Sequence, residues 1–148
     1  MYHSLIFQED DQTRKFNTWD DWHLIPSSRP VFALPSPLFK YVDIPGADGQ
    51  LDLTDYLIGR PTYSDRKGSF EFIVANGYGD WYERRTELAN FFRGQYFKCY
   101  LEDEPQFFYY GRFTFRDWRS EANYSRITIE YQVDAYRYRS KDGEEAGF

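Results

Sequence analysis

The sequence contains one cysteine, Cys99, and two histidines among its 148 residues. A single thiol excludes an internal disulfide and a cysteine-based zinc site, and two imidazoles exclude a histidine-rich metal site. The sequence has no apolar run long enough to cross a bilayer, and no leader with a basic start and an apolar middle. We therefore expect a soluble protein without cofactor, assembled in a reducing cytoplasm and without a membrane partner.

Aromatic residues are abundant instead, at 22% of the chain, with 14 Tyr and 14 Phe. Aromatic side chains suit pleated, half-buried surfaces, and tyrosines favour interfaces because one end packs while the other stays hydrated. The formal net charge of -6 argues against a protein that grips nucleic acid through its phosphates. The composition favours a β-rich domain whose acidic surface repels DNA.

Alternation of apolar and polar residues predicts several strands. A short first strand is expected at 2–8, and 38–44 and 50–54 are expected to form a hairpin around the turn residues of PGADG at 45–49. Further strands are predicted at 66–77, 96–102, 107–118 and 126–134. Because one face of each alternating run is apolar, we predict a mainly β, antiparallel fold, either a β-sandwich or a partly open barrel.

One helix is predicted at 81–93. Asp80 is placed to cap its first turn, Glu83 completes a capping box, and Gly94 follows its end. An apolar stripe with one basic member is expected at Trp81, Arg85, Leu88, Ala89 and Phe92. The helix would flank the sheet.

The remaining segments are read as connections. Residues 9–17 are polar and predict a mobile loop, whereas 19–37 hold four of the seven prolines and predict an extended excursion with a strand near 22–25. We expect a single domain over 1–140, followed by a polar, disordered tail at 141–148.

NTWDDWHLIPSSRP, at 17–30, groups the residue types of a catalytic site. Asp20 and Asp21 would point to opposite faces of an extended chain, so they cannot readily share a proton. His23 could pair with Asp21, and Ser27 or Ser28 could supply a nucleophile, but no strand-to-helix elbow presents either serine. The preferred interpretation is that Trp19 and Trp22 anchor this segment to its own domain or to a neighbour.

Other groupings give weaker signals. The glycines of ANGYGDW lack the rest of a phosphate-loop or dinucleotide motif, and the acids of EDEP and DGQLDLTD do not have the spacing of a calcium loop. Arg112, Arg116 and Arg119 alternate with aromatics as on an amphipathic strand. Cys99 lies among apolar residues and is read as a small core residue rather than a reactive thiol.

Long ordered stretches carry a resemblance to a known family. NTWDDWHLIPSSRPVF, KYVDIPGADGQLDLTDYLIGRPTYSDRKGSFEFIV, NGYGDWYERRTELANFFRGQ, LEDEPQFFYYGRF and ITIEYQVDAYRY together cover nearly all of residues 1–138. In these stretches the chain resembles the N-terminal domain of siphophage distal tail proteins (Dit). Many members continue into a second, C-terminal domain, whereas this sequence stops at Phe148.

The resemblance implies a tail-tube-like fold and a structural role without catalytic residues. It implies a homo-hexameric ring that joins the tail tube protein to the tail-tip or baseplate proteins, through which DNA passes in transit. The location implied is the virion tail tip, after assembly in the bacterial host cytoplasm. For the contacts between copies we expect Trp19, Asp20, Trp22, Pro26, Arg29 and Tyr41.

Two alternatives stay open. A β-sandwich carbohydrate-binding module would use Trp19, Trp22 or Trp118 as sugar platforms. A glycan-cleaving enzyme would need acids such as Asp20, Asp21 or Glu102 across a cleft, but the linear order singles out no such pair.

Overall fold

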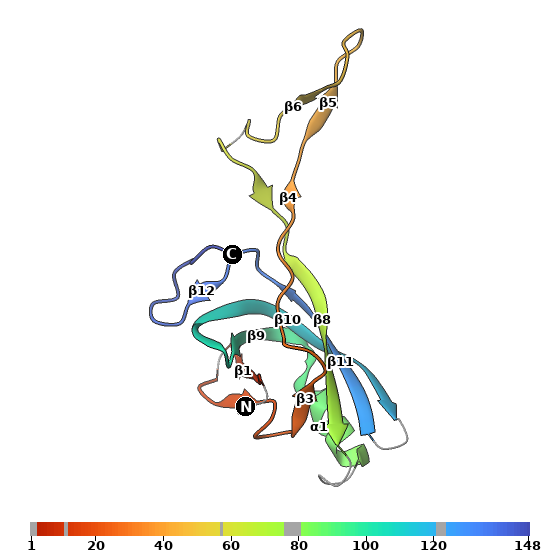
Figure 1. Ribbon diagram of the computed structural model, residues 1–148. Helices are drawn as coiled ribbons and strands as arrows, with labels where there is room; N and C mark the ends of the chain where they lie inside the picture. Colours follow the sequence, from red (N-terminus) through yellow and green to blue (C-terminus); the bar gives the residue numbers. More distant parts are fainter. Residues whose placement is uncertain (1–2, 11, 57, 76–80, 121–123) are drawn as a thin grey trace.

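The computed structural model describes residues 3–10, 12–56, 58–75, 81–120 and 124–148 (Figure 1). The elements of these residues are β1 (Leu5–Glu9), β2 (Lys15–Asn17), β3 (Leu24–Pro26), β4 (Pro37–Leu38), β5 (Tyr41–Asp43), β6 (Gln50–Asp52), β7 (Thr62–Tyr63), β8 (Arg66–Ala75), α1 (Trp81–Phe91), β9 (Arg93–Leu101), β10 (Glu104–Ser120), β11 (Tyr124–Val133) and β12 (Tyr138–Arg139).

One curled antiparallel sheet forms the body of the molecule. Its strand order is β2-β1-β9-β10-β11-β8-β3, and β12 pairs with the first part of β10. The sheet curves into a half-barrel, with α1 at one end (Figure 1). The predicted mainly β, antiparallel fold with one helix is therefore confirmed.

The alternation in the sequence correctly identifies the inward-facing side chains. On β8 the buried apolar residues include Phe70, Phe72 and Val74. On β11 they include Ile127 and Ile129, while β11 pairs with β8 along its whole length. Side chains at alternate positions share one face of a strand, so the apolar faces of these two long strands line one core.

The helix begins at Trp81, where it was predicted, and ends at Phe91 rather than at residue 93. Strand β9 begins at Arg93, whose amide is satisfied by the side chain of Gln95 at 2.8 Å. Gly94 adopts a positive φ of 89°, as its predicted place after the helix requires. Leu88 and Phe92 enter the core, whereas the predicted cap Asp80 lies outside the described residues.

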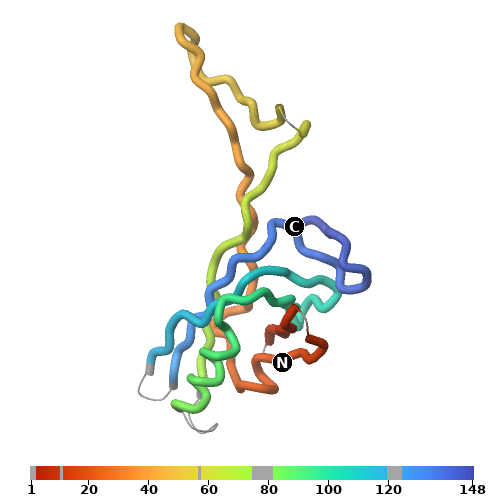
Figure 2. Tube along the Cα trace, turned by 180° about the vertical axis from the view of Figure 1, so that it is seen from behind, coloured from red at the N-terminus to blue at the C-terminus, as the bar shows by residue number. Residues whose placement is uncertain are grey.

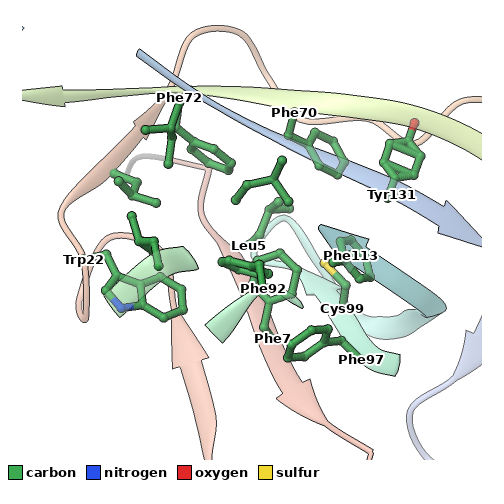
Figure 3. Close-up of a cluster of buried hydrophobic side chains, with 14 of the residues drawn as sticks. Leu5, Phe7, Trp22, Phe70, Phe72, Phe92, Phe97, Cys99, Phe113 and Tyr131 are labelled. Carbon is green, nitrogen blue, oxygen red and sulfur yellow. The ribbon is translucent and has the colours of Figure 1, made fainter. Parts of the chain in front are cut away.

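Phenylalanine rings fill the centre of the core (Figure 3). Phe7 meets the ring of Phe92 edge-on at 4.9 Å and that of Phe113 at 5.0 Å between centroids. Such edge-to-face pairs add stabilisation beyond the burial of area. Cys99 is fully buried beside them, and burial raises the pKa of its thiol well above the ordinary value, as expected for a core residue.

The prediction of a loop over residues 9–17 is wrong in its last part. Residues 15–17 form β2, which pairs with β1 at the edge of the sheet. The reason is Phe16, whose ring stacks on Trp22 with centroids 5.7 Å apart and meets Phe91 at 4.6 Å. The two ring contacts of this single aromatic side chain hold an otherwise polar segment at the edge of the sheet.

Residues 141–148, predicted as a tail, are placed against the preceding strand. The amide of Arg137 donates to the carbonyl of Gly147 at 2.9 Å, and the amide of Ala146 donates to the carbonyl of Arg137 at 2.8 Å. The name C-terminal hairpin is used below for residues 136–148. The predicted domain limit at residue 140 stays a prediction.

Trp22 is 3% exposed and lies within the core, whereas Trp19 is only partly buried. Trp22→Ala should therefore lower the free energy of unfolding by about 3–5 kcal/mol, the usual cost of removing a large core aromatic. Trp19→Ala serves as the matched control and should cost clearly less. Denaturant unfolding of the two variants measures the difference, and equal losses would contradict the assignment of Trp22 to the core.

Gly111 lies where β10 is paired on both sides, opposite Phe97 of β9 and Val133 of β11. A Cβ atom at this position would overlap the backbone of Gln132 and Val133, which cannot move without breaking the ladder. Gly111→Ala should destabilise the chain by about 1–3 kcal/mol, as overpacking does elsewhere. Thr114→Ala, at an exposed position of the same strand, should change the unfolding midpoint little in the same experiment.

Candidate interaction surface

A long two-stranded projection leaves the body between β3 and β8 (Figures 1 and 2). It comprises residues 34–56 and 58–64 and is called the arm below. Near the body, β4 pairs with β7, and farther out β5 pairs with β6. Both ladders are antiparallel and short, so the chain runs outward along one side of the arm and returns along the other.

The end of the arm is built by local turn chemistry. Tyr41 pairs with Asp52 and Asp43 pairs with Gln50, which confirms the predicted hairpin around residues 45–49. Gly46 and Gly49 adopt positive φ values of 80° and 76°, a backbone conformation that glycine adopts without strain. The glycines of this turn therefore reverse the chain, and the sequence alone was enough to locate it.

Polar side chains hold the middle of the arm. The carboxylate of Asp52 accepts hydrogen bonds from both the amide and the hydroxyl of Thr54. These bonds favour the charged form and lower the pKa of Asp52. The Thr54 hydroxyl oxygen also accepts from the amide of Lys40 at 3.0 Å, which ties the two sides of the arm together.

The arm carries most of the exposed apolar side chains. Of the thirteen large hydrophobic residues that are exposed in the described part of the chain, nine lie on it. They are Leu34, Leu38, Phe39, Tyr41, Val42, Ile44, Leu51, Tyr56 and Ile58. An isolated two-stranded hairpin is marginally stable in water, and contiguous exposed apolar surface marks sites of association. The arm is therefore the strongest candidate interaction surface.

The six predicted interface residues fall in three different places. Trp19, Trp22 and Pro26 lie on the body beside the helix and β3, and the indole of Trp22 donates to Glu87 at 3.2 Å. Arg29 is exposed, with its Nε 3.5 Å from a carboxylate oxygen of Asp103.

Asp20 and Tyr41 complete the set. Asp20 is exposed on the turn that precedes Trp22, and Tyr41, 52% exposed, is the only member on the arm. The six positions thus do not form one patch, and their role as an interface stays a prediction.

Acidic and histidine side chains of residues 17–30 make local structural contacts. Asp21 accepts a hydrogen bond from the amide of Asn17 at 2.7 Å, which closes the turn. The ring of His23 meets Trp19 edge-on at 5.1 Å. Within the described residues, no three acidic, histidine or cysteine side chains are grouped in a way that could hold a metal ion.

The tryptophans proposed as sugar platforms are not presented as open flat surfaces. Trp22 is buried, and Trp118 is partly buried with its ring 6.1 Å from that of Phe115. A hollow of about 520 Å³ does lie on the outer face of the sheet, but charged and polar side chains such as Lys67, Arg112 and Arg116 dominate its lining.

The outer face of the sheet pairs many of its charges. Arg126 contacts Glu71 at 2.5 Å, and Arg116 contacts Glu130 at 2.6 Å, in both cases across neighbouring strands. Arg112 donates to the carbonyl of Gly94 at 2.9 Å. Cross-strand pairs of opposite charge stabilise a sheet modestly, so these arginines serve the sheet itself.

No protein-family model matches the sequence, and no curated protein matches it. No helix in the described residues is long and apolar enough to span a membrane.

A solved structure does share the architecture. It is the crystal structure of SPP1 Dit (gp 19.1), a paradigm of the hub adsorption apparatus in phages that infect Gram-positive bacteria. The superposition has a TM-score of 0.62 at 22% sequence identity and covers 91% of this chain but 52% of the other, so this chain spans about half the length of that protein. The chain therefore has a Dit-like fold.

Proposed function

We propose that the protein is a structural hub of a phage tail, in which copies of the chain form a hexameric ring at the tail tip. The ring would join the tail tube protein to the tail-tip proteins. The proposal is supported by the Dit-like fold and by the resemblance of the sequence to that family. The observation that carries it is the arm, whose exposed apolar side chains need a covering surface that its own body does not supply.

In this proposal, the arm of one copy packs against the body of the next copy in the ring. When one patch of a subunit binds a different patch of its neighbour, repeating the contact generates a closed ring if the rotation between subunits adds up to a full turn. A projecting strand pair suits such a contact because it reaches beyond its own domain, as the arm does in Figure 2. Aromatic side chains such as Phe39 and Tyr41 supply large contact areas of the kind that dominates interfaces.

The outer face of the sheet is proposed to border the channel of the ring. Its side chains are polar, and arginines such as Arg116 and Arg126 are already paired with carboxylates of neighbouring strands. Paired cations are less available for phosphate contacts, and the chain as a whole is acidic. DNA would therefore pass without being held. A density map of the assembled tail tests this placement, and a channel bordered by the helix instead would contradict it.

Replacing two apolar residues of the arm tests the association. The double variant Phe39→Ser and Tyr41→Ser should abolish ring formation, while the free energy of unfolding of the single chain stays within about 0.5 kcal/mol, as for other exposed positions. The matched control is Tyr82→Ser, which removes a ring that is 74% exposed on the helix. Native mass spectrometry and electron microscopy at rising protein concentration measure the assembly.

In this experiment the unmodified chain and the Tyr82→Ser control should form rings, and the arm variant should stay monomeric. A wild-type chain that remains monomeric up to its solubility limit would count against the ring. Rings that survive the double replacement would show that the arm is not the contact.

A further inference from the structure

Three segments of the chain converge at Arg66, the first residue of β8. The arm leaves the body after Ala33 and returns to it at Ser64, two residues before Arg66. In the sheet, Arg66 lies opposite Val133, the last residue of β11. The C-terminal hairpin starts just beyond, and Figure 1 shows the C-terminus close to the base of the arm.

The guanidinium of Arg66 joins two of these segments directly. Its Nε donates to the carbonyl of Ala135 at 3.1 Å, and its Nη1 donates to the carbonyl of Ala33 at 3.2 Å. Neither alanine belongs to a strand, so neither carbonyl is held there by the ladder of the sheet. The planar fork of arginine presents several donors in fixed directions. One side chain therefore sets the spacing between the start of the arm and the start of the C-terminal hairpin.

The position is costly for a cation. Arg66 is 2% exposed, and burial lowers the pKa of its guanidinium. No carboxylate in the described part of the chain forms an ion pair with it, and its Nη2 is buried without a hydrogen-bond partner there. The face of Tyr109, 5.2 Å from the guanidinium carbon, offers partial compensation. An apolar side chain would fill the same space without the desolvation cost, but it would not bind two carbonyls.

The C-terminal hairpin also packs on the arm itself. The ring of Phe148 meets that of Tyr63 of β7 edge-on at 4.7 Å, and it stacks on Tyr136 at 5.3 Å. The hydroxyl of Tyr136 accepts a hydrogen bond at 3.1 Å from Arg60, which lies on the returning side of the arm just before β7. The same Phe148 ring lies 6.0 Å from the Arg66 guanidinium. The base of the arm is thus held between the sheet and the C-terminal hairpin.

We propose that Arg66 is the positioning residue of the arm: its fork fixes the direction in which the arm leaves the sheet, and it couples that direction to the C-terminal hairpin. The ladder of β4 and β7 is only two residues long on each strand, with two further hydrogen bonds between Ser36 and Ser64, so we expect the contacts of Arg66 to be needed to orient the outer part. A change at the C-terminal hairpin would therefore be transmitted to the arm. The inference concerns the single chain and does not rest on the proposed ring.

Distance measurements between two spin labels test the proposal on the isolated full chain. One label is placed at the end of the arm through Asp48→Cys, and the other on the body through Thr114→Cys, both at exposed positions. The native Cys99 is fully buried and stays unlabelled. The wild-type background should give a narrow distance distribution. Arg66→Met and Arg66→Lys should each broaden it by about twofold or more, because methionine has no donor and the single ammonium of lysine does not reproduce the two separate nitrogens of the rigid fork.

Arg119→Met is the matched control, since Arg119 is a largely exposed arginine of β10 and its loss should leave the distribution unchanged. Phe148→Ala, at a ring that is 45% exposed, should broaden the distribution to a smaller extent while leaving the sheet intact. Near-ultraviolet circular dichroism verifies that each variant is folded.

Folded Arg66 variants with an unchanged distribution would overturn the proposal, as would an unchanged distribution in Phe148→Ala. Failure of both Arg66 variants to fold would also overturn it, because Arg66 would then serve the stability of the sheet. A wild-type chain that remains monomeric up to its solubility limit, with the expected broadening in the variants, would count against the ring and leave this inference standing.

Discussion

A strand pair that stands away from its domain cannot bury its own apolar side chains, and this constraint governs the molecule. The arm has two short ladders and one row of backbone hydrogen bonds in each. Nine of its apolar residues, Tyr56 at 78% exposed and Leu34 at 74% among them, remain exposed to solvent in the single chain. Because hydrophobic stabilisation scales with the area removed from water, the arm reaches its full stability only against another surface. The shape of the chain therefore supports the proposed association.

The body shows the opposite distribution of side chains. Its inner face is closed by aromatic rings, with Phe7 in edge contact with Phe92 and Phe113. Its outer face is polar, and arginines there contact carboxylates on the neighbouring strand. Such a sheet is stable without a partner and offers few apolar groups to one. The arm is therefore the better candidate for contacts between copies, and the outer face of the sheet is the better candidate for a hydrated surface. Both features suit the proposed hub around a channel.

Acidic and histidine side chains that suggested chemistry in the sequence instead fasten turns. Asp21 closes the turn before Trp22, and Asp103 lies 2.7 Å from the ring of His3 and near Arg29. Asp21 binds the nearby amide of Asn17, whereas Asp103 binds the side chains of His3 and Arg29, which are distant in the sequence. Clusters of residue types in a sequence are common at turns for this reason, because short polar side chains satisfy backbone amides there.

Local patterns in the sequence determined the long strands of the sheet, the helix and the turn of the arm. Alternation placed Phe70, Phe72 and Val74 on one face, and the glycines of residues 45–49 marked the hairpin, since both depend only on neighbouring residues. Tertiary structure alone decided that Phe16 packs its polar segment against the sheet, that Trp22 is buried, and that the arm projects into solvent. It also decided that Arg66 is buried, although its sequence neighbours are polar. These outcomes depend on which distant segments cover a given side chain. The local alternation of apolar and polar residues contains no information about those distant segments.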